Sequence, residues 1–437
     1  MSAIAKEFSP LVEGYPTQDP RDAAKRGRPD FGSLATDALQ PNVLVRWAFY
    51  LSLFSIPFAL LSLPGTGGRI SVIRLLQMLI LCAILSQPRV CIRFVPTALF
   101  WFLAYCAVRI VAGFWLAPEQ ATVWWPSTLI LLQFALPWVW VMFNVLQFPN
   151  MSRRGLWALV WGCVFCALFH IAGIGMVEVD QGVEGRSTVF GENANGAGAT
   201  YAIALIVLVG LGMFRDLGLM QRLLLFPLIA LVGTGMAKTG SRSSVLILAM
   251  GISVLIFQGR AFGSTTKRVA LLLAIGIILA GVVWRIPTVL ERFQKVRSSA
   301  ELQQQEGRVR MAPVLWEMFL RSPIYGSGPD EYQFELTRRA MPYHFRDQRL
   351  ISAHNLILML LVETGIIGFL LFAFGVRPAL VGAWRARLSP CGSLPLAVIV
   401  PLIMAGATVS QPGFQLVFWF AMAYALAGPD RQWIVRR

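Results

Sequence analysis

The feature that most constrains this chain is a series of long apolar runs separated by short polar segments. A run of about 20 apolar residues is long enough to cross the hydrocarbon core of a bilayer as an α-helix. The runs are uniformly apolar rather than alternating, so they do not fit the strands of a membrane barrel. We therefore predict an all-α membrane protein with about twelve transmembrane helices, at residues 44–63, 70–86, 92–113, 122–147, 155–177, 196–214, 219–235, 243–258, 268–287, 353–376, 392–409 and 413–428.

Composition excludes the main alternatives. Of the 437 residues, 56% are hydrophobic and only 14% are charged, whereas a soluble domain carries about 25% charged residues. The chain is therefore not an ordinary water-soluble enzyme. The net charge of +16 is scattered between the apolar runs rather than gathered on one face, so we expect no nucleic-acid partner. Membrane lipid and lipid diphosphates remain as anionic partners.

The distribution of basic residues predicts how the helices are oriented. Lysine and arginine are enriched in cytoplasmic loops. With the amino terminus inside, the loops on the cytoplasmic side hold most of the cations, such as Arg153, Arg154, Lys267 and Arg385. The short outer loops hold only Arg69, Arg186, Lys238 and Arg242. We expect both termini in the cytoplasm, as polar tails at residues 1–42 and 429–437, flanking helices one to nine (43–287) and ten to twelve (353–428).

Residues 288–352 form a long polar stretch that this orientation puts on the outer face. Long loops without a function are uncommon. Within it, residues 307–321 have the apolar spacing of an amphipathic helix, and we expect the apolar face to carry Val309, Ala312, Leu315, Trp316 and Phe319. This helix would either lie on the membrane surface or cap the bundle.

Polar residues at the outer helix ends are the candidates for chemistry. They are Arg186 after the fifth run, Arg242 before the eighth, Arg308 or Arg310 in the long loop, and His354 at the start of the tenth. Arg308 and Arg310 are two apart and would not share a helix face, so only one of them is expected to point at a site. Each candidate also has a structural alternative: a turn, an interfacial arginine, a solvated charge or an interfacial histidine.

Two asparagines accompany the first arginine. Asn193 and Asn195 lie in the glycine-rich segment EGRSTVFGENANGAGA. Their amides either hydrogen-bond sugars or cap the sixth helix. Arg242 lies beside Ser241 and Ser243 at an expected helix N-terminus, where a cation is unfavourable. That conflict indicates a bound anion.

Three arginines and a histidine on one side of the membrane favour a specific chemistry. Guanidinium groups stay charged and bind phosphate oxygens in bidentate fashion, so they stabilise a diphosphate leaving group without a metal. A neutral imidazole accepts a proton from an attacking hydroxyl. This set suits glycosyl transfer from a lipid diphosphate sugar. A metal-dependent reaction would need acidic ligands, for which Glu178 and Asp180 are the best but weak candidates, so we expect no metal and no cofactor.

These segments resemble the O-antigen ligase and polymerase superfamily of bacterial inner-membrane proteins. The similarity covers about residues 186–376. It is carried by RSTVFGENANG at 186, GSRSS at 240 and GRVRM at 307, and then by Pro323, Gly326, Gly328, His354, Asn355, Glu363, Gly365 and Gly368 in the family's order.

The resemblance implies a metal-independent, inverting glycosyltransferase at the periplasmic face of the inner membrane. Its donor would be a glycan on undecaprenyl diphosphate. Its acceptor would be either lipid A-core or a growing polysaccharide. His354 would activate the acceptor hydroxyl, and Arg242, Arg308 or Arg310, and Arg186 would bind the diphosphate. Asn193, Asn195, Asn355 and Glu363 would contact substrate.

Two alternatives stay open. The layout, with one large outer loop between helices nine and ten, resembles the ligases, but O-antigen or exopolysaccharide polymerases of the superfamily also fit. A lipid-linked sugar flippase is the alternative from another class. Transporters place coupling charges at mid-membrane, and the deepest ionisable residues here are Arg74, Arg109 and His170. We expect no buried carboxylate, which argues against ion coupling.

Overall fold

Helices account for nearly all of the structure. This computed structural model describes residues 40–59, 61–62, 71–148, 150–178, 187–190, 193–213, 218–258, 264, 266, 268, 307–340, 355–387, 392–406 and 416–428. Its helices are α3 (Val43–Phe54), α4 (Val72–Ser86), α5 (Pro88–Cys91), α6 (Thr97–Leu116), α7 (Ala121–Ile130), α8 (Leu136–Val145), α9 (Met151–Ala172), α10 (Ala194–Gly212), α11 (Leu219–Lys238), α12 (Arg242–Gln258), α16 (Gly307–Arg321), α17 (Glu331–Ala340), α18 (Leu356–Ala386), α19 (Ser393–Gly406) and α20 (Leu416–Ala427).

The remaining elements are short. Two 3₁₀-helices cover Ile56–Phe58 and Pro118–Gln120, and a π-helical segment at Leu131–Ala135 joins α7 to α8. Strands β1 (Met176–Glu178) and β2 (Ser187–Val189) pair antiparallel as a hairpin between α9 and α10.

The prediction of a multi-pass helical membrane protein is confirmed. Each predicted apolar run contains a helix, except 268–287, of which only residue 268 is described. Within the described residues, six helical stretches are long and apolar enough to cross a membrane: Thr97–Leu116, Pro118–Val145, Met151–Ala172, Ala194–Gly212, Leu219–Lys238 and Leu356–Ala386. Five further apolar helices of that part of the chain are shorter. The total of twelve transmembrane helices stays a prediction, as do the tails at 1–42 and 429–437, of which only residues 40–42 are described.

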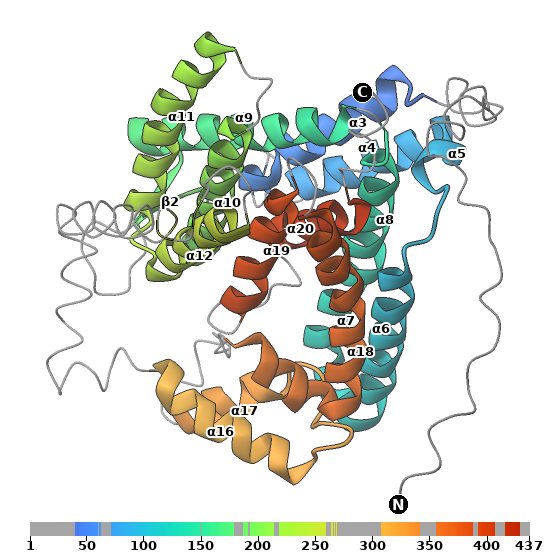
Figure 1. Cartoon of the computed structure of the whole chain (residues 1–437). Coiled ribbons are helices and arrows are strands. Elements are labelled where there is room, and N and C mark those ends of the chain that lie inside the picture. Colours follow the sequence, from blue (N-terminus) through green and yellow to red (C-terminus); the bar gives the residue numbers. More distant parts are fainter. Residues whose placement is uncertain are drawn as a thin grey trace, which may run out of the picture. The chain divides into compact units, whose positions relative to one another are not determined.

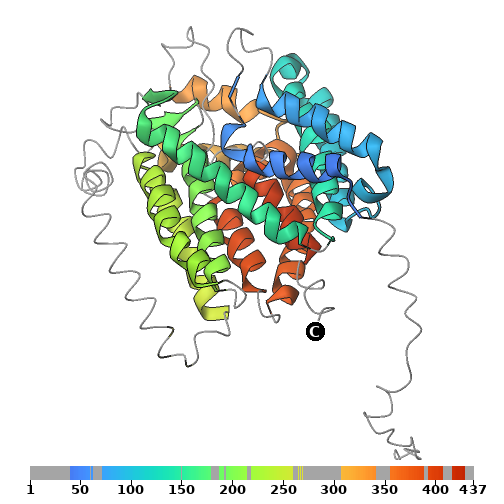
Figure 2. The same ribbon diagram turned by 90° about the horizontal axis from the view of Figure 1, so that it is seen from above.

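The carboxyl-terminal helix lies at the centre of the bundle. Almost every described side chain of α20 is buried, and α20 packs against α8, α18 and α19. Figure 2 shows α19 and α20, in red, between the green helices α9–α12 and the teal helices α6–α8. Because α20 is apolar on all sides, it is suited to this fully enclosed position.

Glycines determine the relative directions of α10, α12 and α19. Gly198 lies against Ser241 and Ser244, and Gly251 lies against Ile206 and Ala397. The chain therefore runs the same way in α10 and α12. Leu394 lies against Gly210, near the end of α10, so α19 runs the opposite way.

Three helix N-termini consequently share one end of the bundle. Gly406 ends α19 and lies against Leu356, the first residue of α18. Because α19 is antiparallel to α10 and α12, its last residue is at the end where those two helices begin. The starts of α10, α12 and α18 are thus on the same side of the bundle, while the side of the membrane that they face stays a prediction.

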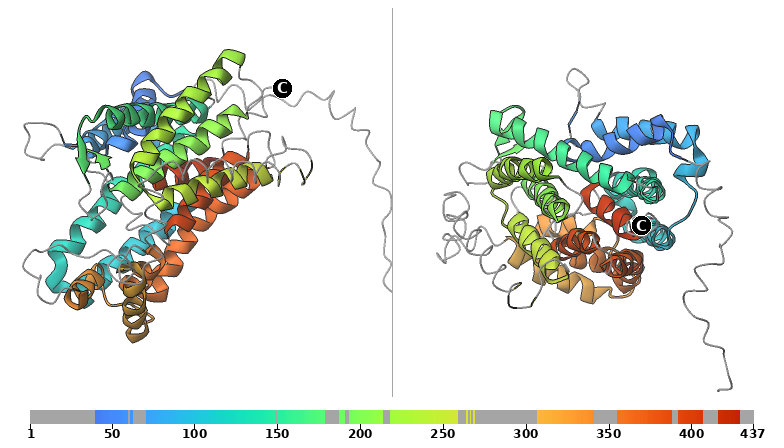
Figure 3. Two further views of the ribbon diagram at one scale, coloured as in Figure 1. Left: turned by 90° about the vertical axis from the view of Figure 1, so that its left-hand side faces the viewer. Right: turned by 45° about the horizontal axis from the view of Figure 1, so that its top comes forward.

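The predicted helix at 307–321 is confirmed as α16, with the expected boundaries. It packs with α17 against the first part of α18, so it caps this part of the bundle (Figures 1 and 3). Its expected apolar face was partly wrong. Leu315 is buried, but Trp316 is 49% exposed, and Met318 is buried in its place against Tyr332 and Val362.

Candidate functional site

The starts of α10 and α12 form a polar junction, which we call the α10–α12 junction (Asn193, Asn195, Ser241, Arg242 and Ser243). Asn193 is the N-cap of α10, and its side chain accepts a hydrogen bond from the Asn195 amide. The Ser241 hydroxyl donates to Asn195 Oδ1 over 3.1 Å and lies 2.9 Å from the Ser243 hydroxyl. Two motifs that are 46 residues apart in sequence therefore meet here.

Close helix contact keeps this junction together. A Cβ atom at Gly198 would lie 3.0 Å from the Cβ atoms of both Ser241 and Ser244. Any larger residue would push α12 away from α10, so glycine allows the two helix starts to meet. The capping role considered for Asn193 is confirmed, while sugar binding by Asn193 and Asn195 stays a prediction.

Arg242 is the first residue of α12 and is partly exposed. Its guanidinium group therefore belongs to the positive end of a helix, where an anion is favoured and a second cation is not. The three hydroxyl and amide side chains beside it are neutral. This combination of helix start, cation and neutral donors is suited to an anionic group.

Strand β2, which follows Arg186 in the sequence, contacts α9 through a side-chain hydrogen bond. Arg186 itself lies outside the described residues. Ser187, the first residue of β2, places its hydroxyl 2.8 Å from Nε2 of His170, which is fully buried. The Lys238 amine donates to the carbonyl of His170 over 3.1 Å. His170 is thus a buried packing residue, as expected. Its contact with Ser187 holds the start of β2, directly after Arg186, against α9.

The start of α18 is capped by Asn355, whose side chain accepts a hydrogen bond from the Leu358 amide over 3.1 Å. His354, the residue before this cap, lies outside the described residues. Arg308 and Arg310 belong to the first turn of α16, but the orientations of their side chains are not described. The structure therefore brings together the α10 and α12 motifs and places the start of α18 on their side of the bundle.

A group of buried charges that the sequence did not predict lies beside α18. We call it the Arg109 centre: Arg109 on α6, Asp330 before α17 and Glu363 on α18. The guanidinium donates to Glu363 Oε2 and, over 3.0 Å, to Asp330 Oδ2. All three residues are at least 96% buried.

Neutral groups complete the hydrogen bonding of the Arg109 centre. Arg109 also donates to the hydroxyls of Thr128 and Ser127, over 3.0 and 2.9 Å. The second Glu363 oxygen accepts from the Asp330 amide, and the second Asp330 oxygen accepts from the Gln333 amide group. Buried charges are tolerated when they are paired and hydrogen-bonded in this way.

Two sequence predictions are corrected by this centre. We expected no buried carboxylate, but Asp330 and Glu363 are both buried. We also expected Glu363 to contact substrate, but its side chain has no exposed surface and both oxygens are already bonded. The signal was available: opposite charges inside two separate apolar runs, Arg109 in 92–113 and Glu363 in 353–376, are expected to pair.

A cavity of about 40 Å³ adjoins the Arg109 centre and is lined partly by Tyr105, Ser127 and Glu363. It has room for a water molecule but not for a sugar or a diphosphate. The Arg109 centre is therefore an internal connection rather than a binding site.

Helix α18 is broken beside this centre. Gly365 has φ 65° and ψ −164°, which no residue within a helix adopts. The turn at residues 322–329 hydrogen-bonds to the backbone on both sides of the break. The Ser327 and Gly328 amides donate to the carbonyls of Val362 and Glu363, over 2.7 and 3.1 Å. The Ile366 amide donates to the carbonyl of Pro323 over 2.9 Å.

The glycines of the two motifs allow this backbone contact. Gly326 has φ 78°, and a Cβ there would lie 2.5 Å from the carbonyl carbon of Glu363. A Cβ at Gly365 would overlap the Ile324 carbonyl. The Pro-x-x-Gly-x-Gly and Glu-x-Gly-x-x-Gly segments thus form one packed unit.

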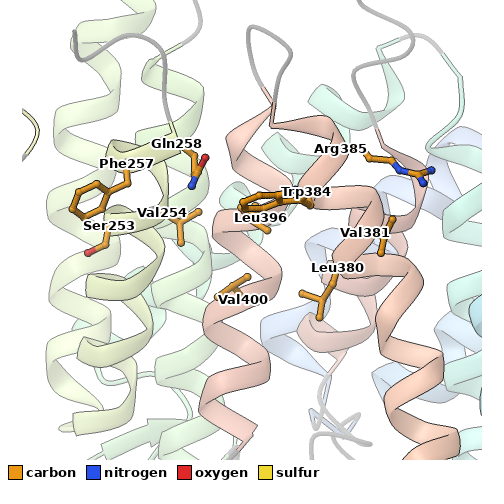
Figure 4. Close-up of a pocket in the computed structure, with 10 residues that line it drawn as sticks. All are labelled: Ser253, Val254, Phe257, Gln258, Leu380, Val381, Trp384, Arg385, Leu396 and Val400. Atoms are coloured by element: carbon orange, nitrogen blue, oxygen red, sulfur yellow. The ribbon is translucent and has the colours of Figure 1, made fainter. Parts of the chain in front are cut away.

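A larger cavity of about 870 Å³ lies at the opposite end of these helices. Figure 4 shows it between the last turns of α12 and α18, with α19 behind, lined by apolar side chains together with Gln258 and Arg385. It is far from the starts of α10, α12 and α18, so it does not belong to the predicted site.

The described residues contain no group of three or more histidine, cysteine or acidic side chains that could hold a metal ion. Asp180 is outside the described residues, and the Glu178 side chain is not described.

Cys163 and Cys166, which form a Cys-x-x-Cys, are buried and contact the carbonyls of Thr200 and Pro57. They therefore serve as packing residues.

Comparison with known proteins gives a family match for part of the chain. The family model for O-antigen ligase matches residues 226–373, from within α11 to within α18. That range includes the start of α12, all of α16 and α17, and the broken part of α18. No curated protein matches the chain. Residues 226–373 of this multi-pass membrane protein are thus similar to the O-antigen ligase family.

Proposed function

We propose that the protein is a glycosyltransferase that moves a glycan from undecaprenyl diphosphate to an acceptor sugar at the periplasmic face of the bacterial inner membrane. The observation that carries this proposal is the common location of three helix starts. Arg242 begins α12, His354 directly precedes the cap of α18, and Arg186 precedes the strand that leads to α10. The O-antigen ligase match supports the same activity.

The reaction is a single displacement without a metal. The imidazole of His354 accepts the proton of the acceptor hydroxyl as that oxygen bonds to the anomeric carbon. The bond from the anomeric carbon to the diphosphate breaks, and the configuration is inverted. Arg242, Arg186 and one of Arg308 and Arg310 bind the departing diphosphate, whose charge grows in the transition state. Asn193, Asn195 and Asn355 are the candidates for contacts with sugar.

We favour a ligase over a polymerase of the same superfamily. The support is the single long polar segment between the ninth and tenth predicted helices. Deleting the gene separates the two. Loss of the ligase leaves lipid A-core without long glycans while the carrier-linked glycan accumulates, whereas loss of a polymerase leaves single repeat units attached.

Two buried carboxylates reopen the flippase alternative, because ion-coupled transporters need such groups. However, both carboxylates are bonded to one arginine and to further donors of the same chain, so neither is available to bind a coupling ion. A carrier-flipping assay in proteoliposomes tests this alternative directly.

Replacing His354 by alanine tests the proposed chemistry. We expect transfer in isolated membranes, with the carrier-linked glycan from the deletion strain as donor, to fall by at least about 100-fold, because general-base catalysis contributes that much. His344→Ala, in the same polar segment, is the matched control and keeps activity. Full activity of His354→Ala, with normal amounts in the membrane, would overturn the assignment of His354. EDTA leaves transfer unchanged if no metal takes part.

A further inference from the structure

The break in α18 divides this helix into two parts with different surroundings. The first part, residues 356–364, packs against α16 and α17 through Leu358, Met359 and Val362. The second part, residues 366–386, packs along α6, as shown by the contact of Gly375 with Phe102. The direction of the first part is thus set at the break and not by a continuous helix.

Backbone contacts at the break come from a segment distant in sequence. Three hydrogen bonds join the turn at 322–329 to residues 362–366. They replace the bonds that the break removes from the helix, since a buried backbone group needs a partner. The turn and the first part of α18 therefore move together.

The Arg109 centre connects that unit to the bundle. Arg109 and its hydroxyl partners Ser127 and Thr128 belong to α6 and α7. Glu363 lies two residues before the break in α18, and Asp330 directly follows the turn at 322–329. One guanidinium group thus contacts both segments that pack together at the break. A lysine could not do this, because its single ammonium group lacks the fork geometry.

We propose that Arg109, acting through Glu363 and Asp330, positions the first part of α18 and with it the chain at His354 for glycosyl transfer. This inference rests on the proposed function. Arg109 is a positioning residue and not a catalytic residue, because the centre is buried and its cavity of about 40 Å³ excludes substrate. The role assigned here to Arg109 and Glu363 is distinct from diphosphate binding.

Enzyme kinetics give the first test. We expect Arg109→Lys to lower kcat by about 10-fold or more with the KM for the carrier-linked glycan unchanged, because a small displacement of a reacting group is enough for such a loss. Ser127→Ala, which removes the hydroxyl that contacts both Arg109 and Asp330 and keeps all three charges, should give a smaller loss in the same direction. Arg74→Lys, an exposed arginine of α4, is the matched control.

Distances between two spin labels give a second test, because a loss of stability alone would not change the angle between the two parts of α18. Labels at Ile357 and Phe374, both exposed and on opposite sides of the break, report the angle between the two parts of α18. In a cysteine-free chain that retains activity, we expect a narrow distance distribution that broadens in Arg109→Lys and Ser127→Ala but not in Arg74→Lys.

The outcomes separate this inference from the proposed function. If His354→Ala is inactive while Arg109→Lys and Ser127→Ala keep full kcat and a narrow distribution, the positioning role is wrong and the glycosyltransferase stands. If His354→Ala is fully active, the proposed chemistry fails whatever the Arg109 variants do. A rise in KM without a fall in kcat would assign Arg109 to substrate binding and overturn the positioning role.

Discussion

The Arg109 centre and the α10–α12 junction use arginine in opposite ways. Arg109 is 4% exposed and contacts two carboxylates and two hydroxyls of its own chain. Arg242 begins a helix and is partly exposed, in a junction that also holds serine and asparagine side chains. The comparison indicates that the buried, acid-paired arginine maintains the fold, whereas a partly exposed arginine at a helix start is suited to an external anion.

The largest expected effect comes from removing the buried arginine. Arg109→Ala leaves Asp330 and Glu363 as two buried carboxylates without their cation, a change that costs about 3–5 kcal/mol. Arg242→Ala changes a partly exposed site and should cost about 0.5 kcal/mol or less, while it lowers transfer more than it lowers stability. Unfolding in detergent, measured for both variants, checks the difference. Equal losses of stability would remove the distinction between the two arginines.

A smaller effect is expected from the turn that packs against the α18 break. Gly326→Ala places a Cβ 2.5 Å from the Glu363 carbonyl carbon at a residue with positive φ, so the strain should cost about 1–3 kcal/mol. Gly233→Ala is the matched control, because nothing lies within 4 Å of a Cβ there and the residue is helical. Thermal unfolding of the two variants should differ clearly. A stable Gly326→Ala protein would show that the turn can move away from α18.

The smallest expected change in stability concerns Glu331, the acidic neighbour of Asp330. Asp330 is paired with Arg109, whereas burial raises the pKa of Glu331 above its ordinary value. A carboxyl group with a raised pKa favours folding when protonated and disfavours it as the pH rises and the charge forms. Glu331→Gln should therefore raise the unfolding temperature slightly at pH 7 and leave it unchanged near pH 4. A loss of stability at pH 7 would mean that the Glu331 charge is favourable.

The sequence was sufficient for the helices but not for the pairing of charges. Long apolar runs predicted the membrane helices, and apolar spacing predicted α16 over its full length. Trp316 was assigned to the wrong face because apolar character does not say which of two adjacent stripes meets α17 and α18. Arg109 and Glu363 are 254 residues apart, and only the folded chain shows that they meet.

The sequence also did not predict where α18 ends or what the glycine motifs do. The predicted run 353–376 became a helix that continues to Ala386, past Arg377 and even past Pro378, which lacks a backbone donor. The glycine motifs were recognised only through resemblance. Their physical reason is the contact of Gly326 and Gly365 with the backbone of the other segment, which requires coordinates.

Helix α18 is longer than the apolar layer of a membrane is thick. A straight helix of 31 residues would be about 46 Å long, well beyond the hydrocarbon layer of about 30 Å. Either α18 tilts or one of its ends projects beyond that layer, and the end that carries Arg377 and Arg385 is the one suited to water.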